Sequence, residues 1–229
     1  MLHKGGRMDF HPPQPADLAN VRSLNGAFLG LVRDSASGKT LRQQLPRDLD
    51  RIIAGLSDPQ LQRLSESPFL LMSFREHDKS FWNLLDQDTH IRDLFLVEQA
   101  TDDKERLVMA GLGFLWQLAN GNPFAARLVS GAPIDWCDRI AESTLFHLLQ
   151  AAAGRSDMLG IRFAGDRTAW DKLLSAGIDS RRSVRAAAQM AVMQSMLTAD
   201  GPASWRGLRA AARTRPLPTR QRHGASRPG

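Results

Sequence analysis

Apolar residues recur at steps of three and four through one long central stretch of the chain, from residue 106 to residue 154. This is the period of helices that bury one face. The recurring positions are Leu107, Val108, Leu112, Leu115 and Leu118, then Ile134, Cys137, Ile140, Ala141, Leu145 and Leu148. The pattern predicts the core of the fold: a central helix opened by Asp102 and Asp103, a short helix over 123–130, and a third helix that Pro133 opens and that continues through residue 148.

The segments before this core predict shorter helices. A first helix begins near Pro15 and ends at about residue 34. Its predicted buried face consists of Leu18, Val21, Leu24, Phe28, Leu31 and Val32. Gly26 and Gly30 on this helix would let another helix approach closely. Prolines and a glycine between residues 40 and 68 divide that stretch into short helices, one of them capped by Ser57 or Asp58.

The run PFLLMSF, residues 68–74, has no readable period, so a helix and a buried strand are both open; we favour a helix. Two helical patterns follow, formed by Phe81, Trp82, Leu84 and Leu85 and then by Ile91, Leu94, Phe95 and Val97. Beyond residue 154 we expect a loop or short helix, a helix closed by Gly177, and a last helix from Asp179 or Ser180 to about Thr198.

Strand-like alternation and a fixed internal repeat are both absent from the sequence. The expected fold is therefore all-α: a single irregular helical domain of about eight helices over residues 15–198. We expect residues 1–14 to be a disordered N-terminal segment, because they are rich in Gly, Pro and His. Residues 199–229 are expected to form a disordered tail of Arg and Pro, because they contain too few large apolar residues to offset the entropy of ordering.

The positive charge of the chain belongs to this tail. The net charge is +6, yet no acid follows Asp200 while seven arginines do, which leaves 23 basic and 24 acidic residues before the tail. Guanidinium groups on a flexible segment bind polyanions such as nucleic acid by releasing counterions. The candidate polyanion-binding residues are Arg206, Arg209, Arg213, Arg215, Arg220, Arg222 and Arg227. A solvated extension without function explains the same composition.

Cysteine usage and hydropathy predict a cytoplasmic protein that does not insert into membranes. The single cysteine, Cys137, has no intramolecular partner, which favours a reducing compartment. The first residues lack the apolar stretch of a secretory signal. Charged and amide side chains interrupt the apolar runs, whereas a bilayer span needs about 20 mostly uncharged apolar residues.

Three patterns resemble catalytic or ligand sites and fail on inspection. SASGKT, residues 35–40, ends like a phosphate-binding loop, but Arg33 stands where the first glycine is required. A metal could use the cluster of His77, Asp78, Asp86, Asp88, His90 and Asp93, whose spacing fits no familiar site. Cys137 and His147 would lie about 15 Å apart on one continuous helix, too far for a nucleophile and its base. We therefore predict no catalytic residue, no metal and no cofactor.

Two helical patterns could instead form surfaces for partners. Residues 125–143 read as a helix, a Gly-containing turn and a second helix, like a helix-turn-helix DNA-binding motif, although Asp135 and Asp138 would repel phosphates. Met190, Met193 and Met196 could form an adaptable protein-binding surface or fill the core.

The leading interpretation is a non-enzymatic interaction or regulatory protein with a protein partner, acting through helix surfaces and assisted by the basic tail. One alternative is an enzyme or small-ligand-binding protein whose site is assembled from residues distant in the sequence. Another is a DNA-binding regulator of the helix-turn-helix kind. A deep apolar pocket with convergent polar groups would favour the enzyme, and a solid core with an exposed apolar patch would favour the interaction protein.

Overall fold

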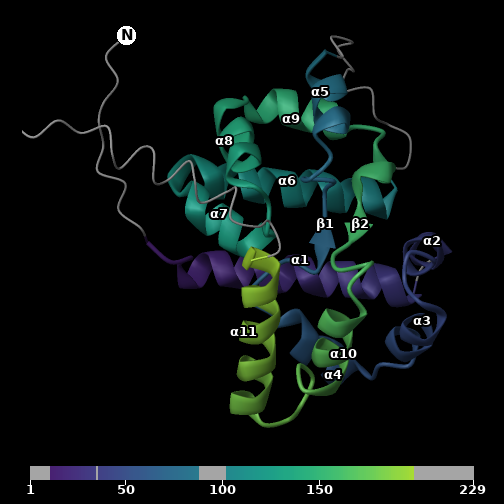
Figure 1. Ribbon diagram of the computed structural model, residues 1–229. Helices are drawn as coiled ribbons and strands as arrows, with labels where there is room; N and C mark the ends of the chain where they lie inside the picture. The colour runs from purple at the N-terminus through teal and green to yellow at the C-terminus, as the bar shows by residue number, and fades with distance from the viewer. Residues whose placement is uncertain (1–10, 35, 88–101, 199–229) are drawn as a thin grey trace, which may run out of the picture. The chain divides into compact units, whose positions relative to one another are not determined.

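The computed structural model of the protein describes residues 11–34, 36–87 and 102–198. These residues form eleven α-helices, one 3₁₀ turn and two very short strands, so the fold is all-α as the sequence predicts (Figure 1). The helices before the core are α1 (Pro15–Asp34), α2 (Ala36–Arg42), α3 (Arg47–Ala54), α4 (Asp58–Ser65) and α5 (Lys79–Gln87). Those of the core are α6 (Asp103–Gly121), α7 (Pro123–Ser130), α8 (Ile134–Glu142) and α9 (Leu145–Ala152). The chain then forms η1 (Ser156–Met158), α10 (Arg167–Ser175) and α11 (Arg182–Thr198), and the strands are β1 (Met72–Ser73) and β2 (Gly160–Ile161).

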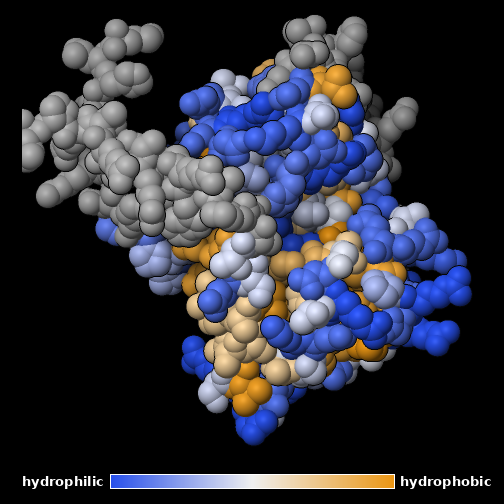
Figure 2. Space-filling view, in the orientation of Figure 1, coloured by the Kyte–Doolittle hydropathy of each residue, from blue (hydrophilic) through white to orange (hydrophobic). Residues whose placement is uncertain are grey.

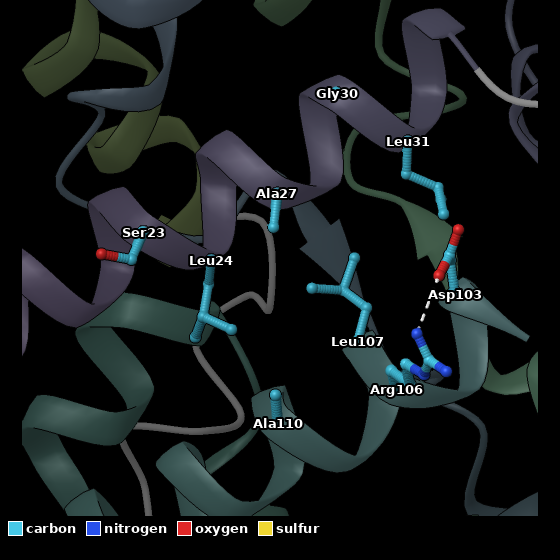
Figure 3. A pocket seen from close by; sticks show the side chains of 9 residues that line it. All are labelled: Ser23, Leu24, Ala27, Gly30, Leu31, Asp103, Arg106, Leu107 and Ala110. Carbon is cyan, nitrogen blue, oxygen red and sulfur yellow. Dashed lines mark ion pairs between the residues drawn. The ribbon is translucent and has the colours of Figure 1, made fainter. Parts of the chain in front are cut away.

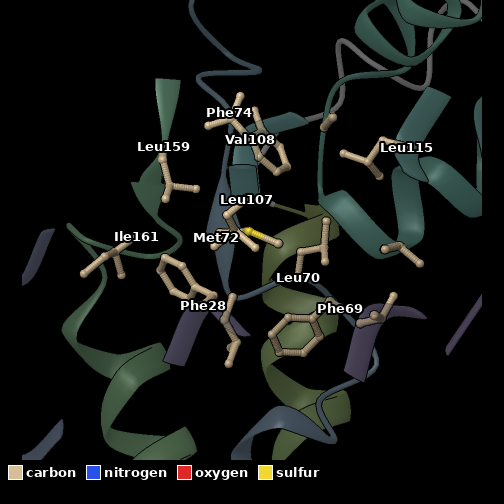
Figure 4. Packing of buried hydrophobic residues seen from close by; sticks show 14 of the residues in the cluster. Phe28, Phe69, Leu70, Met72, Phe74, Leu107, Val108, Leu115, Leu159 and Ile161 are labelled. Carbon is tan, nitrogen blue, oxygen red and sulfur yellow. The ribbon is translucent and has the colours of Figure 1, made fainter. Parts of the chain in front are cut away.

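Helix α6 lies at the centre of the core, as its pattern of leucines predicts. It packs against α1, α7, α8 and α9. Side chains from α1, the segment 69–74, α6 and the strand β2 meet in one cluster, in which Phe28, Met72 and Val108 are buried (Figure 4). The predicted caps are confirmed at both ends of this region: Asp102 accepts a hydrogen bond from the Lys104 amide at 3.4 Å, and Pro123 begins α7.

The third core helix is broken, so the prediction of one continuous helix through residue 148 is wrong. Ser143 and Thr144 both adopt extended backbone and separate α8 from α9. The Ser143 hydroxyl donates to the Arg139 carbonyl at 2.9 Å, and the Thr144 hydroxyl accepts from the His147 amide at 3.1 Å. Short hydroxyl side chains compete in this way with the helix hydrogen bonds and create a new N-terminus.

Residues 68–74 are not helical, which corrects the preference for a helix: Met72 and Ser73 form a strand, and the chain before them bends at residues 68, 69 and 71. Phe69, Leu70 and Leu71 are fully buried, and β1 pairs antiparallel with β2 so that Met72 lies opposite Ile161. A buried segment outside the helices needs partners for its backbone polar groups, and α1 supplies one. The amide nitrogen of Asn25 donates to the Phe69 carbonyl at 2.9 Å, and its oxygen accepts from the Leu71 amide at 2.8 Å.

A buried ion pair holds the two strands at their ends. Arg162 Nη1 lies 2.7 Å from Glu76 Oε1, and the two side chains are only 6% and 1% exposed. The same guanidinium donates to the carbonyls of Leu70 and Met72, both at 2.7 Å, while Glu76 accepts from the Phe74 amide at 2.7 Å. These charges therefore replace hydrogen bonds that strands this short cannot make themselves.

Several positions differ from their predicted surroundings. Leu18, expected on the buried face of the first helix, is 38% exposed, and Leu145 is half-buried rather than buried. A side-chain carbon added at Gly26 or Gly30 would meet nothing within 4 Å, so no described helix approaches α1 closely there. The pattern of Ile91, Leu94, Phe95 and Val97, the expected disorder of residues 1–10 and the tail all lie outside the described residues.

The sequence predicts the positions of the remaining helices better than it predicts how many helices there are. The described residues form more helices than the roughly eight expected, and the break in the third core helix and α2 at residues 36–42 each add one. Within the described ranges, no helix combines the length and the hydropathy that crossing a bilayer requires.

Candidate interaction surfaces

An open apolar groove lies between α1 and α6, with a volume of about 630 Å³ (Figure 3). We call it the α1–α6 groove. It is lined by Ser23, Leu24, Ala27, Gly30, Leu31, Asp103, Arg106, Leu107 and Ala110. Beside the groove the two helices pack against each other, through side chains such as the buried Leu107.

The spacing of small residues on both helices creates this groove. Ser23, Ala27 and Gly30 follow one another at steps of four and three on α1, and Ala110 lies one turn beyond Leu107 on α6. Residues at these steps share one face of a helix. Because their side chains are short, the groove is bounded by the larger Leu24, Leu31 and Leu107 and stays open between them.

Charge is confined to one end of the groove. Arg106 Nη1 lies 3.6 Å from Asp103 Oδ1, and the two side chains are 66% and 68% exposed (Figure 3). An ion pair this exposed contributes little to stability and is screened by salt. Ser23, the other polar residue of the lining, donates its hydroxyl to the Ala19 carbonyl of its own helix at 3.1 Å. The lining therefore lacks the convergent polar groups of a catalytic or small-ligand site.

A second surface lies on α11, and we call it the α11 outer face. It consists of Ala187, Met190, Ala191, Met193, Gln194, Leu197 and Thr198, which line a shallow hollow of about 570 Å³. Met190 is 52% exposed, whereas Val192 and Met196 on the opposite side of the helix are buried. Tan atoms of apolar residues run along much of α11 in Figure 2. The sequence left open whether the methionines fill the core or form a surface for a partner. Met196 belongs to the core, since it packs on Gly131, and Met190 belongs to the exposed surface.

The candidate nucleophile and base lie in different helices, and the thiol is poorly suited to catalysis. Cys137 lies in α8 and His147 in α9, on opposite sides of the break at Ser143. Cys137 is buried, and this burial raises the pKa of its thiol to about 12. A thiol with so high a pKa is protonated at neutral pH and is therefore a weak nucleophile.

The candidate phosphate and metal sites are not assembled within the described part of the chain. Gly38 lies inside α2, where an added side-chain carbon would come within 2.7 Å of the Val32 carbonyl oxygen, so no open loop exists there. Asp78 caps α5 by accepting from the Phe81 amide at 3.0 Å, and this bond and the Arg75 guanidinium lower its pKa. Among the residues that the structure describes, no three His, Cys, Asp or Glu side chains could hold a metal together. Of the proposed metal cluster, only His77 and Asp78 have described side chains.

The helix-turn-helix pattern forms two helices whose exposed side is acidic. Gly131 ends α7 in the left-handed conformation with a φ of 66°, and α8 follows it. Trp136 and Ile140 are buried, as predicted, and Asp135 and Asp138 are exposed. Partial burial and the nearby carboxylates of Glu142 and Asp135 raise the pKa of Asp138.

The sequence indicated only part of these surfaces. The glycines of α1 and the methionines of α11 were visible as patterns, but the pairing of α1 with α6 joins residues about 80 positions apart and left no local signal. The arginines of the tail, from Arg206 to Arg227, lie outside the described residues. No protein-family model, curated protein or solved structure matches this chain.

Proposed function

We propose that this protein is a non-enzymatic interaction or regulatory protein that binds a partner protein in the α1–α6 groove. The observation that carries the proposal is an open apolar groove between two packed helices, with charge at one end alone. A partner helix with apolar residues at i, i+3 or i+4, and i+7 has the chemistry that fits such a groove. The empty space beside Gly30 supports this, because a position without a side chain lets a second helix approach closely.

The other interpretations have less support. An enzyme or a small-ligand-binding protein needs convergent polar groups in its pocket, and the polar residues of the groove pair with each other or with their own helix. A DNA-binding regulator needs a recognition helix that DNA phosphates do not repel, whereas α8 exposes the carboxylates of Asp135 and Asp138. The single cysteine, free and buried, supports a reducing compartment such as the cytoplasm.

We propose polyanion binding as an additional role of the tail. Its support is the distribution of charge along the sequence: seven arginines follow Asp200, and no acid accompanies them. Arginine side chains without a groove-docking helix mainly contact backbone phosphates and distinguish little between base sequences. A protein partner in the groove and a polyanion at the tail would then be bound by separate parts of the chain.

Two glycine substitutions on the same helix test the groove. Gly30→Leu fills the groove, whereas Gly26→Leu adds the same side chain outside the groove lining, and neither added side-chain carbon meets an atom within 4 Å. Both exchange glycine for a better helix former, so both variants should fold. Proximity labelling in the native cell, read by quantitative mass spectrometry, should lose partners at least about tenfold in Gly30→Leu and retain them in Gly26→Leu.

The same labelling experiment can contradict the proposal. Equal sets of partners from both variants would exclude the α1–α6 groove as the binding site. Removing residues 201–229 in a parallel experiment separates the partners that bind residues 1–200 from the partners that bind the tail. If truncation removes every partner and Gly30→Leu removes none, the tail alone would carry the interactions.

A further inference from the structure

Two asparagine–glycine pairs occur in the chain, at Asn25–Gly26 and at Asn120–Gly121. Asparagine is a chemically labile residue. It is most labile before glycine, because the glycine amide nitrogen can attack the asparagine side chain with no Cβ in its way. The other asparagines precede Val21, Leu84 and Pro123, whose side chains or missing N–H hinder this attack. The two pairs therefore share one local chemistry, and their surroundings decide whether it takes place.

This reaction, deamidation, needs only the chain and water. The glycine amide nitrogen bonds to the asparagine side-chain carbon Cγ, and its proton passes by way of water to the side-chain nitrogen, which leaves as ammonia. Water then opens the cyclic imide to aspartate, or to isoaspartate, in which the main chain runs through the side-chain carboxyl. Ring closure requires the asparagine backbone to leave the helical conformation, because a helix holds the attacking nitrogen in a hydrogen bond.

The fold protects the first pair. Asn25 lies in the middle of α1 and is fully buried. Its side-chain nitrogen donates to the Phe69 carbonyl at 2.9 Å, and its side-chain oxygen accepts from the Leu71 amide at 2.8 Å. Leaving the helical conformation at Asn25 would break these bonds and separate α1 from the buried segment before β1. Such an opening requires extensive unfolding.

The second pair lies at the end of a helix. Asn120 and Gly121 are the last two residues of α6, and both are exposed. The Asn120 side chain donates to the Trp116 carbonyl of its own helix at 2.9 Å. A side-chain carbon added at Gly121 would meet nothing within 4 Å, and the next residue, Asn122, has extended backbone with a φ of −158°. The last turn of a helix frays readily, so ring closure is accessible here without unfolding of the core.

We propose that Asn120 deamidates spontaneously in the folded protein, whereas Asn25 is preserved. The product places a carboxylate at the C-terminal end of α6, where the carbonyl dipoles are already negative, so the new charge is unfavourable there. Isoaspartate also lengthens the main chain two residues before Asn122, whose side chain caps α7 by accepting from the Ala125 amide at 3.0 Å. The modification therefore accumulates with time and weakens the junction between α6 and α7.

Peptide mapping by mass spectrometry tests the proposal on the full-length protein, incubated at mildly alkaline pH and digested at acidic pH. The peptide that contains Asn120 should undergo the amide-to-acid conversion at least about tenfold faster than the peptide that contains Asn25. In a sample unfolded in guanidinium chloride the two sites should convert at similar rates, because the same dipeptide is exposed at both. Conversion of Asn25 as fast as Asn120 in the folded protein would overturn the proposal. An Asn120 that stays intact while the unfolded chain converts would overturn it as well.

Two glycine substitutions test whether the conversion proceeds by ring closure. Gly121→Ala places a methyl group beside the attacking nitrogen and should slow the conversion of Asn120 at least about tenfold. Gly26→Ala is the matched control and should leave the rate at Asn120 unchanged. Both variants should fold, because neither added carbon meets an atom within 4 Å. Equal rates at Asn120 in wild type and Gly121→Ala would show that the glycine nitrogen does not attack, which contradicts the proposal.

Discussion

At the residue scale, the pair of Glu76 and Arg162 is the interaction whose loss should cost the most. Removing one partner of a buried ion pair leaves the other charge without compensation, which costs about 3–5 kcal/mol. Glu76→Gln should therefore lower the free energy of unfolding by about that amount in urea titrations. Asp135→Asn removes the Lys79–Asp135 pair at 2.8 Å, whose side chains are 75% and 59% exposed, and should cost at most about 1 kcal/mol. Similar losses in the two variants would contradict the burial of Glu76.

The Cys137 thiol should make stability depend on pH above neutrality. Burial raises its pKa to about 12 from an ordinary value of 9.0. Above pH 9 the unfolded chain therefore loses the thiol proton while the folded chain keeps it, so stability should fall as pH rises from about 9 to 12. The slope from this group is at most about 1.4 kcal/mol per pH unit. Urea midpoints of wild type and Cys137→Ala between pH 8 and pH 10 measure it, and equal slopes would refute the prediction.

At the scale of elements, α6 and α9 should respond differently to the same substitution. Leu115 is fully buried in α6, and Leu115→Ala should destabilise the protein by about 2–5 kcal/mol. Leu145 at the start of α9 is half-buried, and Leu145→Ala should cost roughly half as much, because less apolar surface returns to water. Chemical denaturation of both variants provides the comparison. Equal costs would mean that Leu145 lies in the core after all.

The buried segment before β1 depends on one side chain of α1. Asn25 is fully buried, and it donates to the carbonyls of Ser65, Ser67 and Phe69 and accepts from the Leu71 amide. Asn25→Leu keeps the approximate volume and leaves these backbone groups without partners, so we expect a loss of at least about 2 kcal/mol. Hydrogen exchange of the Leu71 amide should accelerate in the same variant. Unchanged exchange there would show that Asn25 does not hold the segment.

At the scale of the whole molecule, affinity for nucleic acid should depend on the tail. If n arginines contact duplex phosphates, the slope of log K against log salt is about −0.9n, so the seven arginines give at most about −6. Residues 1–200 alone should show a slope near zero. Titrating two labelled duplexes of unrelated sequence into both proteins at several salt concentrations measures this. Binding by residues 1–200 alone, or a preference for one duplex, would mean that the helical domain itself recognises DNA.

The sequence by itself determined the class of the fold and the ends of most helices. Period and capping are local properties, which is why the starts of α1 at Pro15 and α7 at Pro123 and the end of α11 at Thr198 follow from the sequence. The same reasoning placed Trp136 and Ile140 in the core.

Tertiary structure decided what the sequence left open or concealed. Residues 68–74 are not helical because Asn25 and Arg162, far away in the chain, satisfy their backbone, and no local period records such partners. The break at Ser143 combines local capping by hydroxyl groups with a tertiary contact, since Trp116 Nε1 of α6 donates to the Ser143 carbonyl at 2.8 Å. The α1–α6 groove exists only because two distant helices pack together, and the α11 outer face counts as a surface only because the opposite side of α11 is buried. Periodicity reports which residues share a face, and only the packed chain determines which faces are covered.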